Sequence, residues 1–137
     1  MNIIELSLIV NSFLVGIILV VQVVCYPIFL NVAISSFQLY HKEYINRISI
    51  IVIPAMILES ITTIILLIVN DTIYVKIMCL LLFIIWLSTF FIQLPLHNRI
   101  QKRYKVDYIK KLIVSNYLRT ILWVLKLGCI ILIISTN

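Results

Sequence analysis

Ionisable side chains occur inside stretches of this sequence that are otherwise almost wholly apolar. Glu59, Arg119 and Lys126 lie within such stretches, and His41 and His97 lie near the ends of others. An ionisable group at the depth of a bilayer costs at least about 2.5–3.5 kcal/mol on insertion scales, so it generally faces a protein interior and finds a partner. One carboxyl group, two bases and two imidazoles are therefore the candidates for acid–base chemistry.

Helical spacing places polar side chains on one face of each of four segments. The four faces are, in chain order, Asn11, Val15, Ile18, Gln22, Tyr26 and Phe29; Val52, Ala55, Glu59 and Thr63; Trp86, Thr89, Gln93 and His97; and Asn116, Arg119, Thr120, Trp123 and Lys126. Because every segment contributes polar atoms, we expect the faces to look toward one shared interior and away from lipid.

The depth of each residue along its helix sharpens this expectation, at a rise of about 1.5 Å per residue. Glu59 and Lys126 both lie about 21 Å from the cytoplasmic ends of their segments, so they can meet. Arg119 lies about 10–12 Å from that end, and His41 and His97 lie near the rim. The pattern predicts a polar pocket that opens to the cytoplasm, with Glu59 at its floor.

The pocket is predicted to bind a lipophilic small molecule and to act on it by proton abstraction or oxidation, which would make the protein an oxidoreductase-type enzyme. Glu59 is the expected acid–base group, and His97 with His41 would relay protons or hold a metal. The predicted ligand-binding residues are Arg119, Asn116, Gln22, Gln93, Trp86, Trp123 and Lys126.

Other interpretations of the same residues stay open. Glu59 with Lys126 or Arg119 can be a structural ion pair that fixes helix register. A non-catalytic assembly factor or subunit would use the polar faces to pair with a partner's helices. A small transporter is a third alternative, which so short a chain could form only as a homo-oligomer.

A haem or metal cofactor is a further option, although no motif indicates one. His41 and His97 could bracket a haem edge or bind one metal ion. Glu59 lies about 20 Å from the rim, which separates it from such an ion.

Four apolar helices must position these residues. Of 137 residues, 64% are hydrophobic and 12% charged, whereas soluble domains have about 45–50% apolar and roughly 25% charged residues. The mean hydropathy of +1.20 agrees. This composition excludes a cytosolic enzyme and predicts one membrane domain over residues 1–137.

A crossing needs about 20 helical residues, and four segments qualify. We therefore predict an all-α transmembrane four-helix bundle. A short amphipathic helix over residues 33–45, between the first two spans, is expected to lie at the cytoplasmic interface and to roof the pocket. The spans are predicted at about residues 6–30, 46–69, 74–96 and 112–134.

The basic residues predict the topology. Of 11 Lys and Arg residues, those in the first and third connections are Lys42, Arg47, Arg99, Lys102, Arg103, Lys105, Lys110 and Lys111. The positive-inside rule places both connections in the cytoplasm and both termini outside, in the cell inner (plasma) membrane. The basic run between the third and fourth spans is short and wedged between membrane segments, so no nucleic-acid partner is expected.

Several motifs carry a resemblance to known proteins. RISIIVIPAMILES (47–60), WLST (86–89), QLPLH (93–97) and NYLRTILW (116–123) resemble a group of small four-span bacterial membrane proteins of unassigned activity. More distantly, the layout is similar to anthrone-oxygenase-like membrane proteins and to the small membrane protoporphyrinogen oxidase. Compared with the latter, this chain has no histidine in its first helix, and its first basic residue is Lys42. The resemblance implies a four-span fold and suggests haem or porphyrin chemistry, but it carries over no catalytic residue.

Overall fold

The computed structural model describes residues 1–136, and every regular element in this range is a helix. In chain order the elements are α1 (Ile3–Val20), η1 (Val21–Cys25), α2 (Tyr26–Ile28), η2 (Phe29–Asn31), α3 (Ile34–Val69), α4 (Ile73–Ser88), η3 (Thr89–Gln93), α5 (Leu94–Lys102) and α6 (Val106–Thr136). They form four continuous helical runs, each long and apolar enough to cross a bilayer. The predicted all-α four-helix bundle is confirmed.

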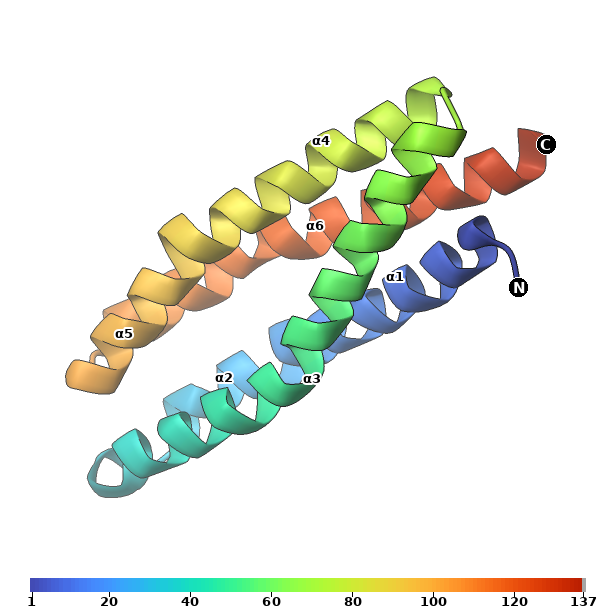
Figure 1. Ribbon diagram of the computed structural model, residues 1–137. Coiled ribbons are helices and arrows are strands. Elements are labelled where there is room, and N and C mark those ends of the chain that lie inside the picture. The colour runs from blue at the N-terminus through green and yellow to red at the C-terminus, as the bar shows by residue number, and fades with distance from the viewer. Residues whose placement is uncertain (137) are drawn as a thin grey trace.

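The four runs form a ring in which each packs on two neighbours (Figure 1). The run containing α1 packs on α3 and α6, and α4 packs on the other sides of the same two helices. Both described ends of the chain lie with the α3–α4 turn at one end of the bundle, which we call the terminal end. The other end holds the α2–α3 and α5–α6 connections and most of the Lys and Arg residues, and we call it the basic end.

The separate interfacial helix expected over residues 33–45 is not confirmed. Helix α3 runs without interruption from Ile34 to Val69, so this segment is the first part of a membrane-length helix. The physical reason is local: no Gly or Pro stands near residues 45 and 46 to end a helix. Phe37 and His41 are buried and Tyr44 is half-buried, so the amphipathic face predicted for the segment packs against the bundle.

Two short π-helical segments interrupt the first and third runs. The segment η1 ends just before Tyr26-Pro27, and η3 ends just before Leu94-Pro95. Proline removes a backbone donor and its ring crowds the preceding turn, and a wider π turn is one way to accommodate both. Such segments are frequent at functional sites. The first contains the buried Gln22 as its second residue, and the second ends at the buried Gln93. Four residues after these glutamines come Tyr26, which is buried, and His97, which is half-buried.

Apolar side chains fill the bundle in three layers. The layer at the basic end includes Phe29, Phe37 and Ile109, the middle layer includes Trp123, and the layer at the terminal end includes Ile130. Most large apolar residues outside these layers are exposed on the outer surface of the helices, as expected for side chains in contact with lipid. Among the described residues, 13 polar or charged side chains are also buried.

Candidate functional site

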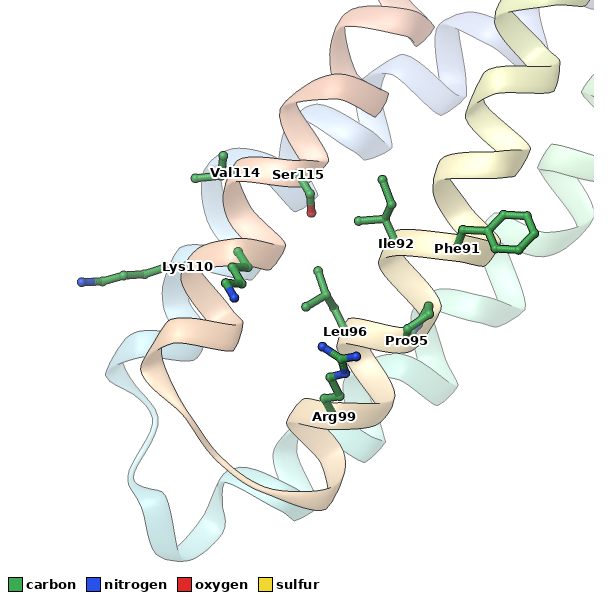
Figure 2. Close-up of a pocket in the computed structure, with 9 residues that line it drawn as sticks. Phe91, Ile92, Pro95, Leu96, Arg99, Lys110, Val114 and Ser115 are labelled. Carbon is green, nitrogen blue, oxygen red and sulfur yellow. The ribbon is translucent and has the colours of Figure 1, made fainter.

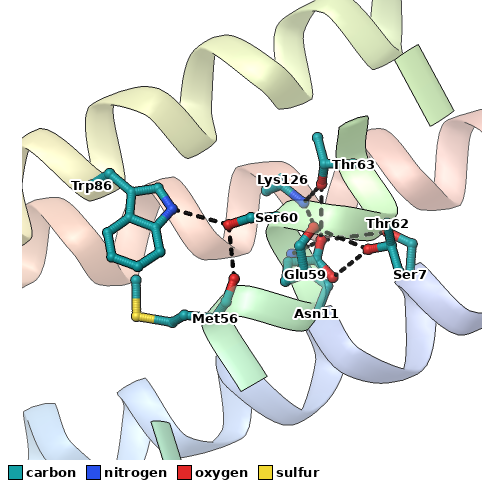
Figure 3. Close-up of polar contacts among 9 residues, drawn as sticks. All are labelled: Ser7, Asn11, Met56, Glu59, Ser60, Thr62, Thr63, Trp86 and Lys126. Carbon is teal, nitrogen blue, oxygen red and sulfur yellow. Dashed lines mark hydrogen bonds and ion pairs between the residues drawn. The ribbon is translucent and has the colours of Figure 1, made fainter. Parts of the chain in front are cut away.

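The first polar group lies toward the terminal end and is closed. We call it the Glu59 cluster, and it comprises Ser7, Asn11, Glu59, Thr62, Thr63 and Lys126, each of which is at most 1% exposed (Figure 3). The Lys126 ammonium donates to Glu59 Oε1 and, at 3.0 Å, to Thr63 Oγ1. Asn11 Nδ2 and Ser7 Oγ each lie 3.4 Å from Glu59 Oε1. The cluster thus joins α1, α3 and α6, and its two charges compensate each other.

The second polar group lies toward the basic end and is a hydrogen-bonded chain. His41 Nδ1 lies 2.7 Å from Gln101 Oε1, and His41 Nε2 lies 3.0 Å from His97 Nδ1. His97 Nε2 lies 3.0 Å from the Tyr26 hydroxyl oxygen. At its other end, Gln101 Nε2 donates to the backbone carbonyl of Gln38 at 3.1 Å. We call these four side chains the histidine relay.

The chemistry of the donors sets the direction of every hydrogen bond in the relay. Because Gln101 Nε2 donates to a carbonyl, Gln101 Oε1 faces His41 and can only accept. His41 Nδ1 must then carry a proton, and neutral His41 accepts at Nε2. His97 therefore donates from Nδ1 and accepts at Nε2 from the Tyr26 hydroxyl. Both imidazoles are held as the Nδ1–H tautomer, and all donors point from Tyr26 toward Gln101.

The third feature is a buried cation, Arg119 of α6, which is 8% exposed. Its Nη1 donates to Asn116 Oδ1 at 3.2 Å, while its Nε has no partner among the described residues. Asn116 is held in turn by Gln22, whose Oε1 accepts from Asn116 Nδ2 at 2.9 Å. No carboxylate within residues 1–136 forms an ion pair with Arg119. Its charge is therefore uncompensated, unlike that of Lys126.

Arg119 and the relay meet at a cavity of about 430 Å³, which is open at one side where the exposed Ile53, Phe90 and Leu94 line it. Its polar lining comprises Tyr26, Tyr44, Ser49, Thr89, Gln93, His97, Asn98 and Arg119. Its apolar lining comprises Leu14, Ile17, Ile18, Val21, Ile45, Ile48, Val52, Ile53, Met56, Trp86, Phe90, Leu94 and Trp123. The cavity has the composition of a site for a mostly apolar molecule with one polar end.

The residues predicted to form one site fall into three groups: those that line the cavity, those that hydrogen-bond to the lining residues, and those of the Glu59 cluster. Arg119, Gln93, Trp86, Trp123 and His97 line the cavity. Asn116 and Gln22 support Arg119 from behind, and His41 supports His97.

Glu59 and Lys126 are not among the residues that line the cavity in the part of the chain that is described. Trp123 lies between the two regions, because its ring lines the cavity and its centroid is 6.0 Å from the Lys126 ammonium. The expected floor of the pocket is thus an apolar wall, and Glu59 belongs to a separate cluster. The Glu59 end and the Arg119 end of the predicted pocket are therefore two separate regions.

Tyr26 and Gln101 have roles that the sequence analysis did not assign. Tyr26 was placed on a polar face, but the direction in which its hydroxyl donates depends on His97, which is far along the chain. The one local signal is the Tyr26-Pro27 pair that follows Gln22, matched by Leu94-Pro95 after Gln93. Both pairs follow π segments.

The residues present do not fit a haem or metal site. Within residues 1–136 no group of three or more His, Cys, Asp or Glu side chains could hold a metal ion. All four ring nitrogens of His41 and His97 are engaged in hydrogen bonds, so neither imidazole offers a free nitrogen to a metal. In this arrangement the two histidines are hydrogen-bond partners of each other.

Comparison of the chain with protein-family models, curated proteins and solved structures finds no match. Fold and composition define its class: four apolar helices compatible with a multi-pass integral membrane protein. A more specific function has to be inferred from the residues that line the cavity.

Proposed function

We propose that this protein binds a lipophilic small molecule in the cavity beside Arg119 and holds an anionic or carbonyl group of that molecule against the Arg119 guanidinium. The observation that carries the proposal is the buried Arg119 guanidinium, which lines the cavity without a carboxylate partner. A buried charge is costly unless it is paired. A bound anion would supply the missing partner, and the guanidinium would bind it through charge-assisted hydrogen bonds.

The shape and lining of the cavity support a lipophilic ligand. A volume of about 430 Å³ lies within the range of roughly 300–1,000 Å³ typical of small-molecule sites. Trp86 and Trp123 supply flat apolar surface at the end of the cavity away from the relay. Trp86 is fixed by a hydrogen bond of 3.0 Å from its indole N–H to Ser60 Oγ. A molecule with one polar end and an apolar body would match this lining.

The histidine relay makes proton abstraction the reaction class that the site is best equipped to perform. A proton taken from the ligand by the Tyr26 oxygen would be balanced by transfer of the phenolic proton to His97 Nε2. His97 would then pass its Nδ1 proton to His41 Nε2, along the direction set by the tautomers. Arg119 beside the ligand would stabilise the negative charge that remains on it. Glu59 has no part in this proton path.

The positive-inside rule supports a cytoplasmic position for the basic end and an outer position for both termini. The relay, which lies toward that end, would then exchange protons with the cytoplasm. The inner membrane and an oxidative reaction remain predictions from the sequence. The alternative of a helper subunit whose polar faces bind a partner's helices receives less support, because these faces already contact one another within the monomer.

Quenching of tryptophan fluorescence tests the proposal, because the chain has two Trp residues and both line the cavity. The probe is a brominated medium-chain carboxylate added to purified protein in detergent, with its methyl ester as the uncharged control. We expect saturable quenching by the carboxylate and an affinity about tenfold lower in Arg119→Gln, from the loss of a charged hydrogen bond.

The matched control is Arg103→Gln, which removes an exposed arginine at the same end of the bundle. This variant should bind the carboxylate as the wild type does. Equal quenching by acid and ester in the wild type, or equal carboxylate affinity in Arg119→Gln, would remove the basis of the proposal.

A further inference from the structure

We propose that a groove between the η3–α5 run and α6, separate from the cavity beside Arg119, is a binding site for an anionic phospholipid. The groove has a volume of about 550 Å³ and shares no lining residue with the cavity. Figure 2 shows Ile92, Leu96 and Arg99 on one side, facing the part of α6 that carries Val114 and Ser115. The site therefore lies on the outer surface of the bundle, where lipid would reach it.

The outer end of the groove is strongly basic. Arg99, Lys110 and Lys111 line it, and all three are exposed. The ion pairs found within residues 1–136 use other side chains, so none of these three cations is neutralised by an acid. Arg binds phosphate through two parallel hydrogen bonds, and Lys adds a mobile point charge. This composition is suited to a phosphate group with a full negative charge.

The inner end of the groove is apolar. Phe91, Ile92 and Val114 line it, and the exposed fractions of Phe91 and Val114 are 75% and 68%. Phe91 precedes Arg99 by eight positions, which corresponds to about 12 Å along a helix. The groove is thus cationic at the basic end and apolar toward the middle of the membrane, in the same order as the headgroup and acyl chains of a phospholipid.

Charge complementarity favours a lipid over a second copy of this chain. The protein carries a formal net charge of +6 and has 5 acidic residues. Glu59 is sealed in its own cluster, and Glu5 and Asp71 belong to the terminal end. Glu43 is paired with Arg47, which leaves Asp107 as the one acid at the basic end without an ion pair among the described residues, so another copy offers little acid to meet the groove. Basic pockets of this kind between transmembrane helices are where anionic headgroups bind. Phosphatidylglycerol supplies both the charge and the chains that the groove requires.

Native mass spectrometry of the detergent-purified protein tests the inference, with dioleoyl phosphatidylglycerol as the probe. The test protein is Arg99→Gln/Lys110→Gln/Lys111→Gln, and the matched control is Lys102→Gln/Arg103→Gln/Lys105→Gln. Both triple variants remove the same charge from exposed positions at the same end of the bundle, but only the first alters the groove. We expect retention of one lipid to weaken by at least about tenfold in the test protein and by less than about twofold in the control.

Equal weakening in both variants would show a diffuse attraction of lipid to the basic end and would overturn the inference. No weakening in either would do the same. Two further probes separate the lipid from its parts. Dioleoyl phosphatidylcholine should bind more weakly than phosphatidylglycerol, and dihexanoyl phosphatidylglycerol should also bind more weakly. Displacement of the long-chain lipid by inorganic phosphate alone would show a simple phosphate site and would contradict the proposal.

Discussion

The Glu59 cluster and the Arg119 site contain similar residues, yet one is complete and the other is not. Lys126 is fully buried and meets a carboxylate and a hydroxyl, so its charge is satisfied inside the monomer. Arg119 is also buried, but it meets one amide oxygen and lines a cavity. Burial alone therefore does not separate the two cations. They differ in having or lacking a carboxylate partner among the described residues, and in whether the side chain lines the cavity.

The largest expected effect comes from breaking the Glu59 cluster. Glu59→Gln leaves the Lys126 charge buried without a counter-charge, which should lower the free energy of unfolding by about 3–5 kcal/mol. Unfolding in detergent, followed by circular dichroism, measures this loss. The control is Glu43→Gln, which breaks the exposed Glu43–Arg47 pair and should change stability by less than about 1 kcal/mol.

The double variant Glu59→Gln/Lys126→Met completes this test. Removal of both charges should restore most of the stability lost in Glu59→Gln, because no uncompensated charge remains. A double variant as unstable as the single variant would show that the ion pair is not what matters at this position. A single variant as stable as the wild type would do so as well.

The same substitution in the two cations should give a large effect at Lys126 and a small one at Arg119. Lys126→Met leaves Glu59 buried without its partner and should destabilise the protein by several kcal/mol, about as much as Glu59→Gln. Arg119→Met removes a charge that has no carboxylate partner, so the midpoint of thermal unfolding should stay within a few degrees of the wild type or rise. Equal destabilisation by the two substitutions would contradict the contrast between the two regions.

The smallest expected effect concerns the histidine relay. It depends on which ring nitrogen of His41 and His97 carries the proton. Nitrogen-15 NMR of histidine-labelled protein should find His41 and His97 protonated at Nδ1 when neutral. Tyr26→Phe removes the donor to His97 Nε2 and should cost about 1 kcal/mol of stability. His97 should keep its Nδ1 proton, because His41 Nε2 still accepts from it, while the signal of His97 Nε2 shifts with the loss of its hydrogen bond. The control Tyr117→Phe lies on an exposed face and should leave both histidine spectra unchanged. Protonation at Nε2 in the wild type would reverse the relay.

Much of the fold could be predicted from the sequence because hydropathy and length decide it. The four spans were placed within a few residues at most ends, and the main difference is α3, which continues through the segment expected to form a separate helix. The meeting of Glu59 and Lys126 followed from their equal depths. These features depend only on the depth of each residue along its helix, which can be counted from the sequence.

The division of the site could not be predicted in the same way. Whether Glu59 faces the cavity or Ser7 depends on the rotation of α3 about its axis and on Trp123, which stands between the two regions. In the first and third helical runs, the π segments before Pro27 and Pro95 change which face of the helix the following residues occupy. Depth arguments carry no information about rotation, so residues that face two separate sites were assigned to one pocket.

The most direct test of the central claim is the ratio of affinities for the brominated carboxylate and its methyl ester, measured in three proteins. The account predicts that wild type and Glu59→Gln/Lys126→Met both prefer the carboxylate, because the charge that recognises it is at Arg119. In Arg119→Gln the ratio should fall to about one, with the loss of the single charged donor. A preference that persists in Arg119→Gln, or that disappears in the double variant, would contradict the account.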